Sequence, residues 1–112
     1  ILAGYLLSKS AKVNIKNRRG FTPLIYAARS GSVKTLRFLL NRGASIDEVD
    51  QSGDTALMHA VRMDKLEAVK YLVLRNAALN KRNRYEQTAY SIAKSLDYTK
   101  IMNFLKENGA IE

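Results

Sequence analysis

The sequence predicts an all-α fold: a helical repeat solenoid of stacked helix-turn-helix units joined by inter-repeat turns. The main observation is an internal period of 33 residues, which superposes residues of like type through the whole unit. The matched sets are Thr22, Thr55 and Thr88; Leu24, Leu57 and Tyr90; Ala27, Ala60 and Ala93; Leu36, Val69 and Met102; Phe38, Tyr71 and Phe104; and Leu39, Leu72 and Leu105. Repeats of this length imply supersecondary units that bury their apolar faces against one another.

The second observation is a helix start and a helix break at fixed places in each unit. Thr22 is well placed to cap a first helix, with Pro23 at its tolerated first position, and Thr55 and Thr88 can cap in the same way. Break-and-restart signals follow at Gly31-Ser32, Asp64 and Asp97. Each unit therefore contains two helices.

The second helix of each unit is expected to be amphipathic. Its apolar residues in the first full unit recur at helical spacing and are Val33, Leu36, Leu39 and Leu40. It is expected to end at Gly43, and at Asn76 and Gly109 in the later units, because these residues adopt the left-handed conformation most readily. Polar stretches, 47–53 and 80–86, then connect the units.

We expect residues 1–112 to form a single domain with unit boundaries at 1–16, 17–49, 50–82 and 83–112. Residues 1–11 fit the second helix of a preceding unit, which predicts a fragment of a longer array. Such an array is expected to be monomeric when intact, and truncation would cause self-association through exposed apolar residues. The last unit is expected to be a terminal cap with a more polar outer side, formed by Lys94, Lys100, Asn103 and Lys106.

The segments GFTPLIYAARSG (20–31) and LLNRGA (39–44) strongly resemble the ankyrin repeat, and the resemblance covers nearly the whole chain. The family's usual histidine after Thr-Pro-Leu is replaced by Ile25, Met58 and Ser91, so its hydrogen-bond bracing between units should be absent. Glu86 replaces the glycine of the third turn, which predicts a distorted turn there.

The residues give little support for catalysis, so we predict no enzyme, cofactor or metal site. The single histidine, His59, occupies a repeat position that is usually packed and is expected to be structural. The acidic cluster Asp47, Glu48, Asp50 and Asp54 lacks the ligand spacing of a calcium loop and is expected to be a solvated connecting loop. The glycines match neither a phosphate-binding loop nor a dinucleotide fingerprint.

The chain is strongly basic, with 19 lysines and arginines against 10 acidic residues and a formal charge of +9. An acidic partner is therefore expected: an acidic protein face, a nucleic-acid backbone or an anionic lipid surface. No apolar stretch approaches the roughly 20 residues that span a bilayer, so no membrane span is expected. The absence of cysteine leaves the cellular compartment open.

The resemblance to ankyrin repeats implies that the inter-repeat turns and the exposed sides of the first helices line a concave groove that contacts partners. The predicted contact residues are Lys16, Arg18, Arg19, Phe21, Arg29, Gln51, Asp54, Arg62, Met63, Arg82, Arg84, Tyr85 and Gln87. Arginine dominates this set and can grip carboxylates through two parallel hydrogen bonds. Phe21 and Tyr85 would be natural anchors if they are exposed.

The leading functional prediction is a non-catalytic module that binds an acidic protein along this basic groove. One alternative is polyanion binding through Lys16, Arg18, Arg19, Lys81, Arg82 and Arg84. Aromatic residues are sparse among these charges, which disfavours a single-strand binder. A second alternative is a purely structural spacer in a longer array.

Overall fold

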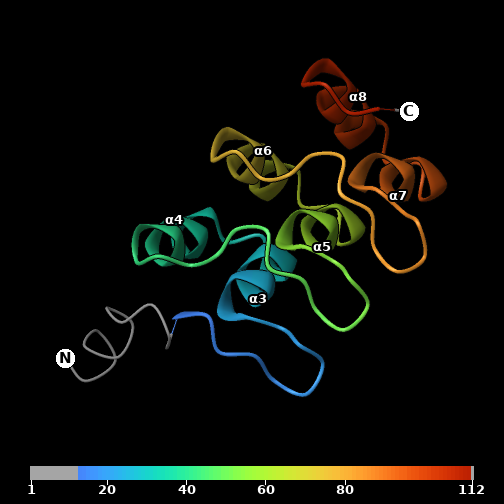
Figure 1. Ribbon diagram of the computed structural model, residues 1–112. Helices are drawn as coiled ribbons and strands as arrows, with labels where there is room; N and C mark the ends of the chain where they lie inside the picture. The colour runs from blue at the N-terminus through green and yellow to red at the C-terminus, as the bar shows by residue number, and fades with distance from the viewer. Residues whose placement is uncertain (1–12, 112) are drawn as a thin grey trace.

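The computed structural model describes residues 13–111, and within them it contains six helices and no strand. The helices form three pairs: α3 (Pro23–Ser30) with α4 (Val33–Asn41), α5 (Ala56–Arg62) with α6 (Leu66–Leu74), and α7 (Ala89–Ser95) with α8 (Thr99–Glu107). The pairs stack in chain order, with α3, α5 and α7 in one layer and α4, α6 and α8 in the other (Figure 1). This arrangement confirms the predicted all-helical repeat fold.

The first helix of each unit begins where the sequence predicts. Thr22, Thr55 and Thr88 have extended backbones, and each side-chain oxygen accepts a hydrogen bond from the N–H three residues later, at 3.2, 3.3 and 3.1 Å. Pro23 occupies the first turn of α3, where its missing N–H would have no intrahelical partner. The predicted caps are therefore confirmed.

Left-handed residues separate the helices. Gly31, Asp64 and Asp97 follow the first helices with φ of 77°, 59° and 62°, and Gly43, Asn76 and Gly109 follow the second helices with φ of 96°, 69° and 103°. Glycine and, less readily, Asn and Asp tolerate this conformation. The predicted breaks and helix ends are thus confirmed.

A continuous apolar core lies between the two helix layers. Its largest fully buried members include Leu24, Leu36, Leu57, Leu72 and Leu105, which come from all three units. Helix α5 packs against both α3 and α7, and α6 packs against both α4 and α8. Because the middle unit has a neighbour on each side, its apolar faces are covered by residues of other units.

Side-chain hydrogen bonds join successive units at one repeated position. The side-chain oxygens of Asn14, Asp47 and Asn80 accept bonds from the backbone N–H groups of residues 45, 78 and 111, at 2.8, 2.8 and 2.9 Å. At the family's histidine position, Ile25 and Met58 are buried apolar side chains. These carboxamides and this carboxylate therefore provide bracing between units that does not depend on histidine.

The prediction of a distorted third turn is wrong. Glu86 adopts a φ of 63° and donates its N–H to the carbonyl of Asn83 at 3.1 Å, as Gly53 does to Asp50 at 3.0 Å. The turn keeps its hydrogen bonds because Glu86 accepts the strained left-handed conformation.

The predicted polar residues Lys94, Lys100, Asn103 and Lys106 are all exposed, and the terminal cap that they were expected to form stays a prediction. The expected helix at residues 1–11, and the self-association derived from it, lie outside the described residues and stay predictions.

Candidate functional site

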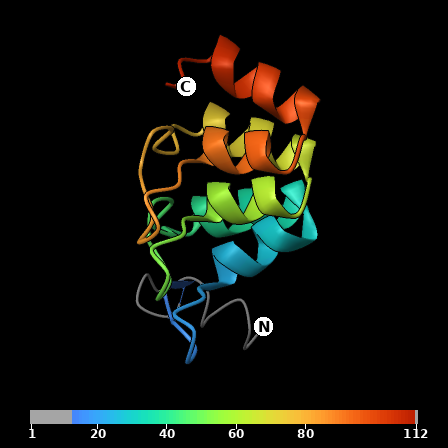
Figure 2. The ribbon, with the colours of Figure 1, turned by 90° about the vertical axis from the view of Figure 1, so that its right-hand side faces the viewer.

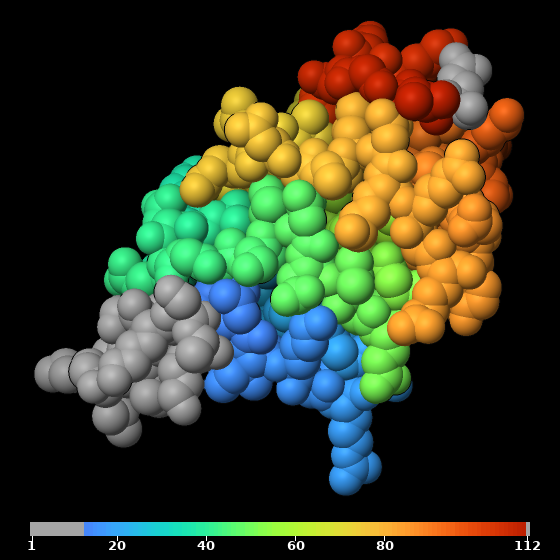
Figure 3. Space-filling view, viewed as in Figure 1, coloured from blue at the N-terminus to red at the C-terminus, as the bar shows by residue number. Residues whose placement is uncertain are grey.

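Three hairpin turns form one edge of the molecule, at residues 17–21, 50–54 and 83–87. Each is closed by two backbone hydrogen bonds of 2.9 to 3.1 Å, and the tips are joined to each other by Gln51 N–H to Arg19 O at 3.0 Å and Arg84 N–H to Ser52 O at 2.9 Å. A Cβ on Gly53 would lie 2.9 Å from the backbone nitrogen of Arg84, so this close approach requires glycine. The tips therefore form a connected row along the stack (Figures 1 and 3).

One residue in each hairpin organises the turn from within. The side-chain oxygen of Asn17, Asp50 or Asn83 accepts two backbone N–H groups of its own turn, at 2.8 to 3.0 Å. In the first two units the other side-chain atom reaches the first helix: Asn17 Nδ2 donates to the Tyr26 hydroxyl at 2.6 Å, and Asp50 Oδ2 lies 2.7 Å from His59 Nε2. These residues thus tie each turn to the helix behind it.

His59 lies at the centre of this surface and is only 3% exposed. Its Nδ1 is 3.2 Å from Arg29 Nη1, and because a guanidinium can only donate, Nδ1 must be the acceptor. Nε2 therefore carries the hydrogen and donates it to Asp50. Burial lowers the pKa of His59 below its ordinary value, despite the raising effect of the Asp50 carboxylate, which agrees with a neutral imidazole. The prediction of a packed structural histidine is confirmed, and its partners are now identified.

Asp54 links the middle unit to the last one. Its Oδ2 accepts from Arg62 Nη1 at 2.8 Å, and its Oδ1 accepts from Asn83 Nδ2 at 2.8 Å, while Asn83 also donates to Gln87 Oε1 at 2.8 Å. Asp54 and Asn83 are each 5% exposed, whereas the Arg62 side chain is 32% exposed. The bond between Asp54 and Asn83 joins residues 29 positions apart and so holds adjacent hairpins together.

The prediction of a solvated acidic loop is wrong for Asp50 and Asp54. Their exposed fractions are 7% and 5%, because the turn folds both side chains inward beneath the first helices. The ligand atoms of Asp50, Asp54 and His59 lie within 4.8 Å of one another, a spacing that could hold a metal ion. Asp50 already accepts a hydrogen bond from His59, and Asp54 already pairs with Arg62, so the geometry fits a hydrogen-bonded structural network better than a cation site.

The structure divides the predicted contact residues into two groups. The first group takes part in contacts within the protein: Phe21, Arg29, Asp54, Arg62 and Gln87. The second group is exposed: Lys16, Arg18, Arg19, Gln51, Met63, Arg82, Arg84 and Tyr85. Among these, Lys16 donates to Val49 O at 2.9 Å, and Arg82 pairs with Glu86 at 3.3 Å.

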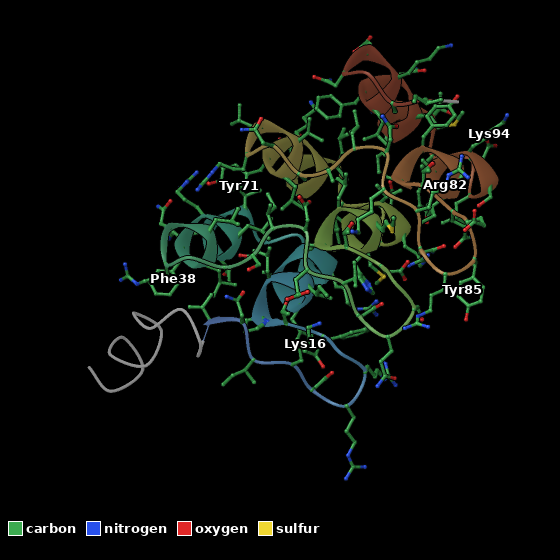
Figure 4. All side chains as sticks on the ribbon, viewed as in Figure 1. Lys16, Phe38, Tyr71, Arg82, Tyr85 and Lys94 are labelled. Atoms are coloured by element: carbon green, nitrogen blue, oxygen red, sulfur yellow. The ribbon has the colours of Figure 1, made fainter. Side chains whose placement is uncertain are left out.

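The two aromatic anchor candidates have different positions. Phe21 is 9% exposed and packs edge-on against His59, with ring centroids 5.0 Å apart, while Arg19 and Arg29 lie over its ring. An exposed anchor role for Phe21 is therefore excluded. Tyr85 is 71% exposed and lies at the tip of the third hairpin (Figure 4).

Sequence reasoning missed Asn17, Asp50 and Asn83 as a functional set. The signal was present, because these residues are 33 positions apart, in register with the rest of the repeat. Asp50 was interpreted as part of an acidic cluster with its neighbours in the sequence, so the repeat position that it shares with Asn17 and Asn83 was overlooked.

The stacked pairs, the connected hairpin row and the bracing between units define a helical repeat solenoid whose hairpins project together beyond one end of the stacked helices (Figure 2). A family model described as ankyrin repeats (3 copies) matches residues 2–83 and 43–111. The chain belongs to the ankyrin repeat family, whose members are generally protein–protein interaction modules and are typically not enzymes. A search of curated proteins finds no significant match. Within residues 13–111, no helix is long and apolar enough to cross a membrane.

Proposed function

We propose that this protein is a non-catalytic module that binds an acidic protein along the surface formed by the hairpin tips and the first helices. The observation that carries the proposal is the pair of exposed arginines, Arg18 and Arg84, at equivalent positions in the first and third hairpins. Neither guanidinium forms an ion pair within the described residues, so both are available to a partner's carboxylates.

Exposed apolar residues on the same hairpins and first helices add contact area. Tyr85 is 71% exposed at a hairpin tip, and Met63 and Leu96, which end α5 and α7, are 40% and 44% exposed. Aromatic residues, methionine and arginine are enriched at protein interfaces, where a few such residues account for most of the binding energy. The partner is therefore expected to combine carboxylates with at least one apolar side chain.

The test compares two variants with the same change in charge on opposite sides of the molecule. The hairpin variant is Arg18→Glu with Arg84→Glu, and the matched control is Arg37→Glu with Arg42→Glu on α4 and its end. Each is used to capture proteins from a lysate treated with nuclease, and any captured protein is then purified and titrated calorimetrically. Since interface arginines and aromatics contribute about 1 to 4 kcal/mol each, the double hairpin variant should weaken binding by at least tenfold and Tyr85→Ala by at least about fivefold.

The control variant should retain wild-type affinity. Equal loss in both variants would show attraction by net charge and contradict a specific groove. Retention that is seen in a parallel untreated lysate but is lost after nuclease treatment would identify a nucleic-acid polyanion as the ligand. Unchanged affinity in both variants would contradict the proposal, because binding would then not depend on the hairpin arginines.

A further inference from the structure

A second basic surface lies on the opposite side of the molecule, on the outer sides of α4 and α6. Helix α4 and its end residue carry Lys34, Arg37 and Arg42 and no acidic residue. Helix α6 and its end residue carry Lys70 and Arg75 against a single Glu67, whose carboxylate is 3.9 Å from Lys70. We call this the outer face. It is separate from the hairpin surface, as the positions of Phe38 and Tyr71 relative to Tyr85 show (Figure 4).

The arginines of the outer face are held in place by aromatic rings. Arg42 lies 4.6 Å from the centroid of Phe38, and Arg37 and Arg75 each lie 5.7 Å from the centroid of Tyr71. Arg75 also donates to the Tyr71 hydroxyl at 2.6 Å. Stacking on an aromatic ring restricts the orientation of a guanidinium but leaves N–H donors at its edge available for hydrogen bonds. A guanidinium that is ordered in this way is well suited to bind phosphate oxygens.

A protruding aliphatic side chain accompanies these cations. Leu74, adjacent to Arg75, is 73% exposed, and Phe38 is 38% exposed. A cationic face with an apolar tip is the composition that favours the interface of an anionic bilayer, where the cations meet phosphates and the apolar group enters below them. A nucleic acid would leave Leu74 without an apolar partner, and arginines already lie over the Phe38 and Tyr71 rings on which bases would stack.

We propose that the outer face is a peripheral binding surface for anionic lipid membranes. Arg37, Arg42 and Arg75 would contact lipid phosphates, and Leu74 would insert beside them. Binding through this face leaves the hairpin tips on the far side of the molecule, so a membrane and a protein partner could be held at the same time.

The test is co-sedimentation of the full chain with vesicles of phosphatidylcholine mixed with phosphatidylserine, and with vesicles of phosphatidylcholine alone. Three variants are compared with the wild type: Arg37→Glu with Arg42→Glu on the outer face, Arg18→Glu with Arg84→Glu on the hairpins, and Leu74→Ser. The first two carry the same net charge, so they separate a located surface from general attraction. Circular dichroism and urea midpoints check that all variants are folded.

The wild type is expected to bind only the vesicles that contain phosphatidylserine. Each basic residue at a lipid surface contributes about fivefold in partitioning, so the outer-face variant should bind at least roughly 25-fold more weakly. Leu74→Ser should lose about tenfold without any change of charge. The hairpin variant should bind within about threefold of the wild type, because its arginines lie more than a Debye length of roughly 8 Å from the membrane.

Failure of the wild type to bind the anionic vesicles would overturn the proposal. So would equal losses in the outer-face and hairpin variants, or an unchanged affinity of Leu74→Ser. Binding of the outer face to immobilised polyglutamate but not to vesicles would also overturn it, by identifying an acidic protein as the occupant.

Discussion

The pair formed by Asp50 and His59 can be tested with the residues that the third unit places at the same two positions. Those residues are Asn83 and Ile92, which are 5% and 2% exposed, so both are compatible with burial in this fold. The substitutions are therefore Asp50→Asn and His59→Ile, separately and together.

Asp50→Asn alone should preserve the hydrogen bonds of the turn but should replace the acceptor of the His59 N–H by a donor. The Asn side-chain oxygen can accept the two turn N–H groups, as it does in Asn83, and its NH2 group then faces His59 Nε2–H. If His59 changed tautomer, its Nδ1–H would face the donor of Arg29 instead. A donor meets a donor in either case, so the free energy of unfolding should fall by about 1.5 to 3 kcal/mol.

His59→Ile alone should cost a similar amount, about 2 to 3 kcal/mol, because the buried Oδ2 of Asp50 loses its partner. The double variant has neither the contact between two donors nor the unpaired carboxylate oxygen. The new amide can donate to the carboxylate of Asp54, as Asn83 donates to Gln87 one unit later. The double variant should therefore cost only about 1 to 2 kcal/mol, which corresponds to a coupling energy of roughly 3 kcal/mol.

The assay is urea unfolding at neutral pH, followed by helical circular dichroism, with the m-value used to check that the same surface is exposed in each variant. Lys34→Asn, at an exposed position on α4, serves as a control and should change stability by less than about 0.5 kcal/mol. If the two single losses add to within about 0.5 kcal/mol in the double variant, Asp50 and His59 are not coupled and the reasoning is refuted.

Three further predictions concern the same turns. Burial lowers the pKa of His59 in the folded state, so the imidazole of the unfolded chain takes up a proton at higher pH than that of the folded chain. The urea midpoint should therefore fall as the pH drops below about 6.5, and this pH dependence should vanish in His59→Ile. Glu86→Gly should raise the free energy of unfolding by up to about 1 kcal/mol, since relief of the φ of 63° outweighs the added freedom of the unfolded chain; a lower urea midpoint would contradict this. Gly53→Ala should lower the free energy of unfolding by more than about 1 kcal/mol, because residue 53 has a φ of 81° and the new Cβ would clash with the backbone of Arg84. An unchanged urea midpoint would show that the turn can shift to accept the Cβ.

The fold could be predicted from the sequence because its determinants are local and repeat. Thr22 and its equivalents cap helices through the N–H three residues later, and Gly31 and its equivalents end them through their own backbone conformation. These interactions need no knowledge of distant residues. The 33-residue period then predicted that the units stack, since the apolar faces of amphipathic helices in similar units can cover one another.

The site could not be predicted in the same way because its contacts join distant residues. His59 meets Arg29 across 30 residues, and Asp54 meets Asn83 across 29. Phe21 was predicted as an anchor because it is an aromatic residue near a turn, but the imidazole of the next unit covers it. The repeat register does relate the contacts within a unit, since position 17 meets 26 and position 50 meets 59, but it does not predict these contacts between units.

Net charge also failed to predict where positive potential is available. In the middle of the hairpin surface, the two charges of Arg29 and Arg62 are equal in number to those of Asp50 and Asp54, although the whole chain carries a charge of +9. Under the proposed function, an acidic partner would therefore be recognised by arginines that have no ion-pair partner within the described residues.

The spacing of those residues restricts the shape of the partner. Arg18 and Arg84 occupy the same position in the first and third hairpins, and the second hairpin places the uncharged Gln51 between them. Packed helices lie about 8 to 10 Å apart, so two repeat units separate the arginines by roughly 20 Å. A single carboxylate cannot reach both, and a uniformly charged strand would gain nothing from the neutral middle. Under the proposed function, the arrangement favours a folded or extended protein segment with two acidic groups at that separation and an uncharged residue opposite Gln51.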